Sequence, residues 1–135
     1  MKREDRVGGL RDARWRERMA ALERLDHHAT KADEPALVKA LADRSSRVRR
    51  LAAHAIGCRQ CKSVPLDLDV VGLLDRLARR DPVLRVRRVA LHLLGTQPPS
   101  ARVARSLRAA QRRETEPRTR LVIAWGLARH VRAAR

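Results

Sequence analysis

The phrase RVRRLAAHAIG at residues 47–57 recurs as RVRRVALHLLG at residues 85–95. The two copies start 38 residues apart, a period typical of stacked helical repeats. Within each copy the apolar residues recur three and four positions apart, which predicts an amphipathic helix. This repeated phrase decides the fold.

An acidic residue stands six positions before an arginine in each copy, and the same pair occurs at two further places. The four pairs are Asp12 with Arg18, Asp43 with Arg49, Asp81 with Arg87, and Glu114 with Arg120. Core positions follow three and seven residues after each arginine: Ala21, Ala52, Ala90 and Ile123, then Leu25, Ile56, Leu94 and Leu127. These spacings lie on one face of a helix, so the pattern predicts four related helices.

A second amphipathic segment precedes every copy except the first, at residues 33–43, 67–80 and 100–113. Asp33 is a candidate N-cap, and Ser45 or Ser46 can cap the helix that follows. Gly57 and Gly95 stand where two helices are expected to end. No alternating strand pattern competes with these segments. The sequence therefore predicts an all-α fold of seven helices in pairs, with the first repeat lacking its leading helix.

The 135 residues fit one domain, which we divide into a flexible basic tail at 1–9 and a repeat domain at 10–135. Apolar residues make up 44% of the chain, enough for a core of Leu, Val and Ala. Charges interrupt every apolar segment, and no apolar region follows the basic N-terminus, so we expect neither a membrane span nor a secretory signal. Two cysteines are too few for a disulfide framework, and a cytoplasmic location is the expectation.

The repeat resembles that of HEAT-repeat proteins, especially the short bacterial HEAT-like type first noticed in phycobilin lyases. The resemblance rests on the pattern D…VR..AA..LG, in DRSSRVRRLAAHAIG and DPVLRVRRVALHLLG, and it covers about residues 10–130. It implies a right-handed α-solenoid of about four repeats, with the second helix of each pair on the concave surface. It also implies a ladder linking neighbouring turns, in which Asp12, Asp43, Asp81 and Glu114 pair with Arg18, Arg49, Arg87 and Arg120.

Positive charge is the dominant compositional feature. Thirty-two Lys and Arg, 28 of them Arg, face 15 Asp and Glu, which gives a net charge of +17. Such self-repulsion disfavours a compact state, and an anionic partner relieves it. The composition therefore favours a nucleic acid or an acidic protein as partner.

Part of this charge is expected on the helix face opposite the core. Two positions before each ladder arginine stand Arg16, Arg47, Arg85 and Arg118; Arg50, Arg88, Arg129, Arg132 and Trp125 share the same face. Arginine suits a phosphate backbone because its guanidinium group stays charged and can donate hydrogen bonds to two oxygens at once. We therefore predict a basic groove for a nucleic-acid backbone, read without strong sequence preference. A groove for an acidic protein segment, or a merely solvated face, are the alternatives.

His54, Cys58 and Cys61 are spaced as H-x3-C-x2-C, and His92 occupies the matching position in the next repeat. These are side chains that bind zinc, which takes four such ligands. A single C-x-x-C is a weak signature, so we expect no metal and no cofactor. A redox-active cysteine pair is a further alternative to ordinary thiols.

Enzymatic HEAT proteins offer three comparisons. Di-iron hydroxylases of this type use His-Glu pairs, and this sequence contains no His-Glu dipeptide. DNA glycosylase-like repeats carry an Asp in a basic groove, whereas Glu23 is the acidic residue on the predicted face here. Nothing marks the tetrapyrrole site of a phycobilin lyase. We therefore expect a non-catalytic binding module with no membrane or small-molecule partner. A DNA glycosylase-like or phycobilin lyase-like enzyme is the less favoured alternative.

Overall fold

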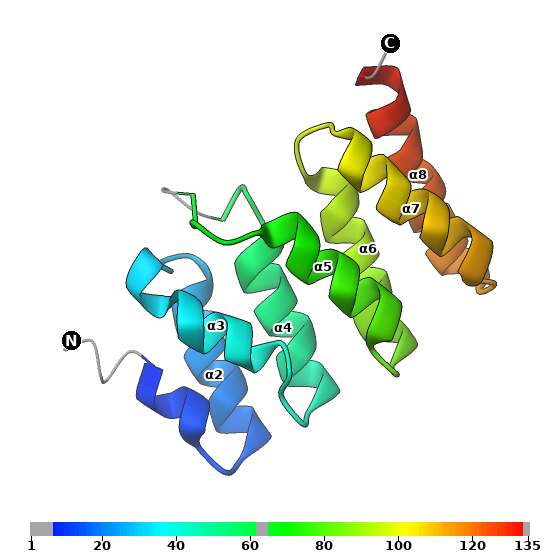
Figure 1. The fold of residues 1–135 in the computed structure, drawn as a ribbon. Helices are drawn as coiled ribbons and strands as arrows, with labels where there is room; N and C mark the ends of the chain where they lie inside the picture. The colour runs from blue at the N-terminus through cyan, green and yellow to red at the C-terminus, as the bar shows by residue number, and fades with distance from the viewer. Residues whose placement is uncertain (1–6, 62–64, 134–135) are drawn as a thin grey trace. The chain divides into compact units, whose positions relative to one another are not determined.

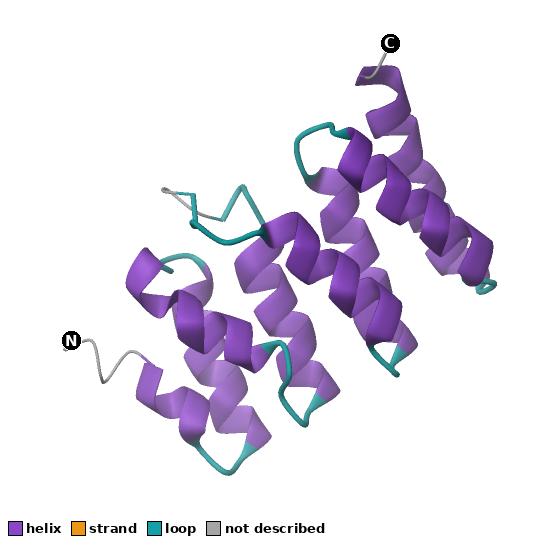
Figure 2. Ribbon diagram, in the orientation of Figure 1, coloured by secondary structure: helices purple, strands orange, loops and turns teal. Residues whose placement is uncertain are grey.

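The computed structural model describes residues 7–61 and 65–133, and every regular element in these ranges is helical (Figures 1 and 2). The α-helices are α2 (Trp15–Asp26), α3 (Glu34–Ala40), α4 (Ser46–Gly57), α5 (Val70–Arg80), α6 (Leu84–Thr96), α7 (Ala101–Arg113) and α8 (Pro117–Ala133). Two short 3-10 helices, η1 (Gly9–Arg11) and η2 (Lys31–Asp33), accompany them. The prediction of an all-α fold is confirmed. None of the described helices is long and apolar enough to cross a membrane.

The chain forms two compact units, Met1–Leu68 and Asp69–Arg135. In the first unit α4 packs against both α2 and α3, and η1 packs on α2 (Figure 1). Residues 1–6 of the tail predicted at 1–9 lie outside the described residues, while residues 7–9 lead in helical conformation into η1. Within the described residues, helical residues 7 and 8 and the 3-10 helix η1 therefore precede α2.

The second unit consists of two helical hairpins, α5 with α6 and α7 with α8. The hairpins stack in register, with α6 against α8 and α5 against α7 (Figure 1). Leading helices therefore form one layer of this unit, and second helices form the other. The layered arrangement follows from amphipathic helices that each bury one stripe of apolar residues.

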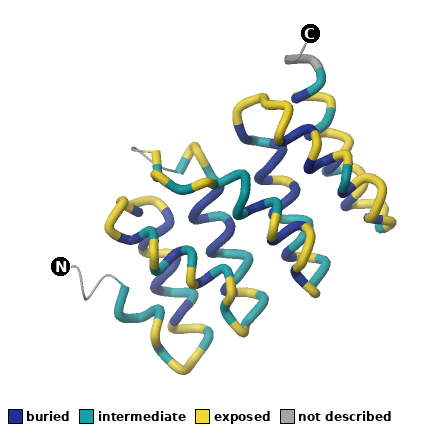
Figure 3. The backbone as a smooth tube through the Cα atoms, viewed as in Figure 1, coloured by how far each residue is buried: buried dark blue, intermediate teal, exposed yellow. Residues whose placement is uncertain are grey.

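The core includes almost all of the positions that the periodic pattern selects, and Figure 3 shows where the buried residues lie along the chain. The four residues three positions after the ladder arginines, Ala21, Ala52, Ala90 and Ile123, are completely buried. Of the residues seven positions after, Leu25, Ile56 and Leu94 are buried and Leu127 is half-buried. Alanine at the first position leaves little side chain between neighbouring helices, which allows close packing.

Ser45 is the N-cap residue of α4, as predicted, but the contacts at the helix start differ from those expected. Neither Ser45 nor Ser46 caps α4 with its side chain; instead Oδ1 of Asp43 accepts the N–H of Ser45 at 2.8 Å. The same Asx turn recurs where Asp12 accepts the N–H of Arg14 and where Asp81 accepts the N–H of Val83. Asp33 forms a capping box with Thr30 around η2 rather than capping α3 with its side chain.

Gly95 lies one residue before the end of α6, close to the predicted position, and it also serves helix packing. Helix α6 continues to Thr96, and no glycine among the described residues has a positive φ. A Cβ atom at Gly95 would lie 3.1 Å from Cα of Gly126 and 3.2 Å from Cζ3 of Trp125. Helices α6 and α8 therefore approach closely at a pair of glycines. Gly57, by contrast, is the last residue of α4, as predicted.

Candidate functional site

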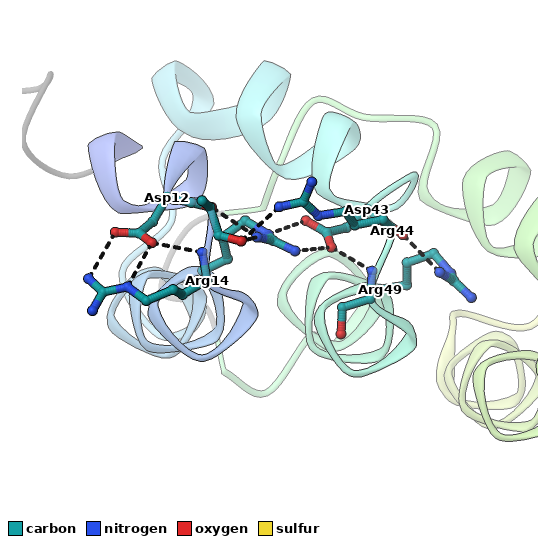
Figure 4. A network of polar contacts seen from close by, with 8 residues as sticks. Asp12, Arg14, Asp43, Arg44 and Arg49 are labelled. Atoms are coloured by element: carbon teal, nitrogen blue, oxygen red, sulfur yellow. Dashed lines mark hydrogen bonds and ion pairs between the residues drawn. The ribbon is translucent and has the colours of Figure 1, made fainter.

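The ladder arginine of the first repeat lies almost fully buried, with 5% of its surface exposed. Nε and Nη2 of Arg18 donate to the two carboxylate oxygens of Asp43 at 2.7 and 3.0 Å. Nη1 donates to the backbone carbonyls of Asp12 and Ala13, both at 2.9 Å. Figure 4 shows this network around the labelled residues Asp12 and Asp43. The hydrogen bonds of Arg18 thus join its own repeat to the next one in the first unit.

The other ladder arginines follow the same rule. Each donates Nη1 to the backbone carbonyl of the acid six positions earlier: Arg49 to Asp43, Arg87 to Asp81, and Arg120 to Glu114. Nε of Arg87 donates to the carboxylate of Glu114 in the following repeat, at 2.8 Å. Two ladder ion pairs thus join Arg18 with Asp43 and Arg87 with Glu114, each arginine pairing with the acid of the following repeat. At the six-residue spacing, each of the four arginines donates to a backbone carbonyl.

The Arg18–Asp43 pair is charged at neutral pH. Burial opposes ionisation of Asp43, but the hydrogen bonds from Arg18 and from the Ser45 N–H outweigh it and lower the pKa of the carboxyl. The hydrogen bond to Asp43 in turn raises the pKa of Arg18. At the start of the ladder, the hydrogen bond from Arg14 lowers the pKa of Asp12.

The arginines two positions before the ladder are exposed in all four repeats: Arg16, Arg47, Arg85 and Arg118. None of these four side chains forms an ion pair within residues 7–61 and 65–131. We call this set the second-helix arginines. Their charges are not balanced by any described carboxylate at contact distance.

The remaining predicted arginines differ from this set. Arg50 is half-buried, and among the described residues its Nε has no hydrogen-bond partner. Nη1 of Arg88 lies 3.6 Å from the carboxylate of Glu116. Hydrogen bonds from Thr119 lower the pKa of Glu116, and Arg88 adds to this effect. Arg129 donates to the backbone carbonyl of Gly95, whereas the side chain of Arg132 lies outside the described residues.

Trp15 gathers two of the second-helix arginines in the first unit. The guanidinium carbons of Arg16 and Arg47 each lie 4.7 Å from the centre of its ring. Arg47 comes from α4, so the ring holds two like charges from neighbouring helices together. The sequence reasoning missed Trp15, although it stands directly before Arg16 and three positions before the ladder arginine.

Trp125 has a comparable environment in the second unit. Its ring stacks on that of His92 with centroids 5.5 Å apart, and the guanidinium carbon of Arg129 lies 5.1 Å from its centre. The residue is 46% exposed, and Leu121, one turn earlier on α8, is 71% exposed. An aromatic ring with basic neighbours is thus present in each unit.

The leading helices of the second unit, within the described residues, carry five more exposed arginines that form no ion pair: Arg76, Arg80, Arg105, Arg108 and Arg112. The sequence-based predictions did not include them. A pocket of about 350 Å³ beside α5 and α7 contains Arg76 and Arg80, but also Asp69 and Asp75. Asp69 binds Arg102 through two 2.8 Å hydrogen bonds, which lower its pKa. Positive charge is therefore not confined to the second helices.

His54, Cys58 and Cys61 come together at the end of α4. The two Sγ atoms lie 2.8 Å apart without a disulfide bond, and Sγ of Cys61 lies 4.0 Å from Nε2 of His54. One ligand atom from each residue falls within 4.8 Å of the others. His92 belongs to the second unit, where its ring stacks on Trp125.

Comparisons of the chain with protein-family models, with curated proteins and with solved structures found no match. Function is therefore inferred from the chemistry and geometry of the residues described above.

Proposed function

We propose that the chain is a non-catalytic HEAT-like protein, a right-handed α-solenoid of about four repeats, whose second-helix arginines bind a nucleic-acid backbone. The repeat assignment is supported by stacked hairpins and by the recurring ladder contacts. Within each unit one ion pair joins two consecutive repeats: Arg18 with Asp43 in the first, and Arg87 with Glu114 in the second. In the proposed solenoid each repeat would present one exposed arginine.

The observation that carries the proposal is the convergence of Arg16 and Arg47 on Trp15. Two guanidinium groups without a carboxylate partner repel each other, and a bound anion would offset that repulsion. A guanidinium lying over a ring keeps its in-plane N–H groups available, and these match two phosphate oxygens. The arrangement therefore favours an anion that offers two oxygens, and a phosphate backbone is the one that we propose.

The second unit supports the same partner class through its charge. It contains 16 basic residues against five acidic ones, whereas the first unit contains 16 against ten. Arg85 and Arg118 are exposed on its second helices. Both tryptophan rings already contact basic side chains, so they are poorly suited to stacking on bases. Recognition would depend on the backbone and would show little sequence preference.

Fluorescence anisotropy with two unrelated DNA duplexes tests the proposal. A variant with Arg16, Arg47, Arg85 and Arg118 all changed to Ser should bind both duplexes more weakly. The slope of log K against log salt should flatten by about 0.9 for each phosphate that the variant no longer neutralises. The matched control changes Arg76, Arg80, Arg105 and Arg108 to Ser, which removes the same charge from the leading helices. Equal weakening in the two variants, or none in the first, would contradict the proposed site.

An acidic protein segment is the alternative partner, and one observation favours it. Leu121 and Trp125 are exposed one turn apart on α8 and could contact apolar side chains that a nucleic acid lacks. In that case duplex binding would be feeble at physiological salt, and Leu121→Ser would reduce capture of the acidic partner. If the partner is a nucleic-acid backbone, Leu121→Ser should leave its binding affinity unchanged.

A further inference from the structure

We propose that His54, Cys58 and Cys61 bind a zinc ion in the first unit. The site is independent of the nucleic-acid surface, because it uses a different set of side chains at the end of α4. It also departs from the sequence-based expectation of a chain without metal. The structure brings together an imidazole nitrogen and two thiols, the ligand types that zinc prefers.

The chain geometry explains how one short segment supplies three ligands. His54 lies in the last turn of α4, and the N–H of Cys58 closes that turn on the His54 carbonyl at 2.9 Å. The backbone then leaves the helix in extended conformation at Cys58, and the following turn brings Cys61 back towards the imidazole. The spacing thus directs all three side chains to one point.

The separations need little adjustment for a metal. Tetrahedral zinc with sulfur at about 2.3 Å and nitrogen at about 2.0 Å places its ligand atoms roughly 3.5–3.8 Å apart. The 4.0 Å from Sγ of Cys61 to Nε2 of His54 is already close to this value. The 2.8 Å between the two sulfurs would have to increase by about 1 Å, which a small side-chain rotation accomplishes.

Asp26 orients the histidine for this role. Its carboxylate, with an 8% exposed side chain, lies 2.8 Å from Nδ1 of His54. When Nδ1–H donates to that carboxylate, the lone pair of Nε2 faces the thiols, as in the carboxylate–histidine pairs that support metal ligands. Asp26 comes from α2, so the packing of α2 on α4 fixes the orientation of the ring. Asp26 is therefore a positioning residue.

The three ligands leave the fourth coordination position of the zinc ion to water or to an added thiol. A redox pair would use only the two sulfurs as reacting atoms, whereas zinc would also use Nε2 of His54, whose ring Asp26 orients. We therefore favour metal binding over a disulfide switch. Because the cluster lies at the C-terminal end of α4, with Cys58 and Cys61 outside the helix, we expect the helices to fold without the metal.

The test uses the full chain, reduced with a phosphine and stripped with a chelator that is then removed. Calorimetric titration with Zn²⁺ should show one ion bound per chain. Titration with Co²⁺ should produce thiolate-to-cobalt charge-transfer absorption and the visible bands of a tetrahedral site. Absence of one-to-one zinc uptake by the reduced chain would overturn the proposal.

Variants identify the ligands. Cys61→Ser and His54→Gln should each abolish the tetrahedral cobalt spectrum, whereas the control His92→Gln should leave it unchanged. Asp26→Asn should retain the one-to-one stoichiometry but weaken zinc binding about 10- to 100-fold, as loss of an orienting carboxylate does. Zinc binding that persists in His54→Gln at full affinity would overturn the three-ligand site and leave the sulfurs as a simple thiol pair. Far-ultraviolet circular dichroism of each variant verifies that it is folded.

Discussion

Replacing Arg18 with Ala should be among the most destabilising changes of a single charged residue in this chain. The substitution removes four hydrogen bonds, two to the carboxylate of Asp43 and two to backbone carbonyls. It also leaves the Asp43 carboxylate, 12% exposed, without its bidentate partner. Both partners are largely shielded from water, so solvent cannot fully replace the interaction between them.

The size of the effect follows from that burial. Breaking a buried ion pair by removing one partner costs about 3–5 kcal/mol, and we expect Arg18→Ala to fall in this range. Arg87→Ala should cost less, about 1.5–3 kcal/mol. Its side chain is 22% exposed and its second hydrogen bond to Glu114 is 3.5 Å long. The order of the two effects is thus a direct consequence of geometry.

Urea unfolding followed by circular dichroism measures both effects, with the slope of the transition unchanged if the denatured state is unaffected. Arg24→Ala is the control, since it removes one exposed positive charge from the same helix, α2. It should change the free energy of unfolding by no more than about 0.5 kcal/mol. The double variant Arg18→Ala with Asp43→Asn should be destabilised by less than the sum of the single variants. A destabilisation by Arg18→Ala no larger than that by Arg24→Ala would refute the ladder as a source of stability.

Two further outcomes are expected. Gly95→Ala should destabilise the chain by about 1–3 kcal/mol, because the added Cβ would crowd Gly126 and Trp125. The control is Gly8→Ala, where no atom lies within 4 Å of the added Cβ, and it should leave thermal unfolding unchanged. Acid should also destabilise the chain. The pKa of Asp43 is lower in the folded chain than the value of about 3.9 expected when the chain is unfolded. The ionised carboxylate therefore contributes fully to the free energy of unfolding above about pH 3.9, and this contribution is lost as pH falls through the folded pKa. Asp43→Asn should flatten the dependence of stability on pH below about 4, and an unaltered dependence would argue against the charged pair.

The helices could be predicted because the information is local and periodic. An acid, an arginine six residues later, and core residues at fixed offsets define a helix start and a buried face without reference to any distant residue. Ser45 is the N-cap residue of α4, as predicted, but its side chain makes no capping hydrogen bond; the Asx turn of Asp43 organises the helix entrance instead. The packing role of Gly95 was not predictable because it depends on Gly126, a residue on another helix.

The candidate sites likewise combine features that the local sequence predicts with features that depend on packing between helices. The exposure of the second-helix arginines follows from helical phase, and the H-x3-C-x2-C spacing is visible in the sequence. The contact of Arg47 with Trp15 was not predictable, since it depends on how α4 packs on α2. Asp26 was also missed, because it lies 28 positions before the histidine that it orients. Pairings between helices require the packing to be known.

The short sequence distance between ladder partners has a kinetic consequence. Arg18 and Asp43 are 25 positions apart, and Arg87 and Glu114 are 27 apart. Closing a loop of this size costs less entropy than joining residues that lie farther apart in the chain. During synthesis at about 5–20 residues per second, each ion pair can form soon after its carboxylate leaves the ribosome. The ladder contact in the first unit therefore does not have to wait for translation of the second.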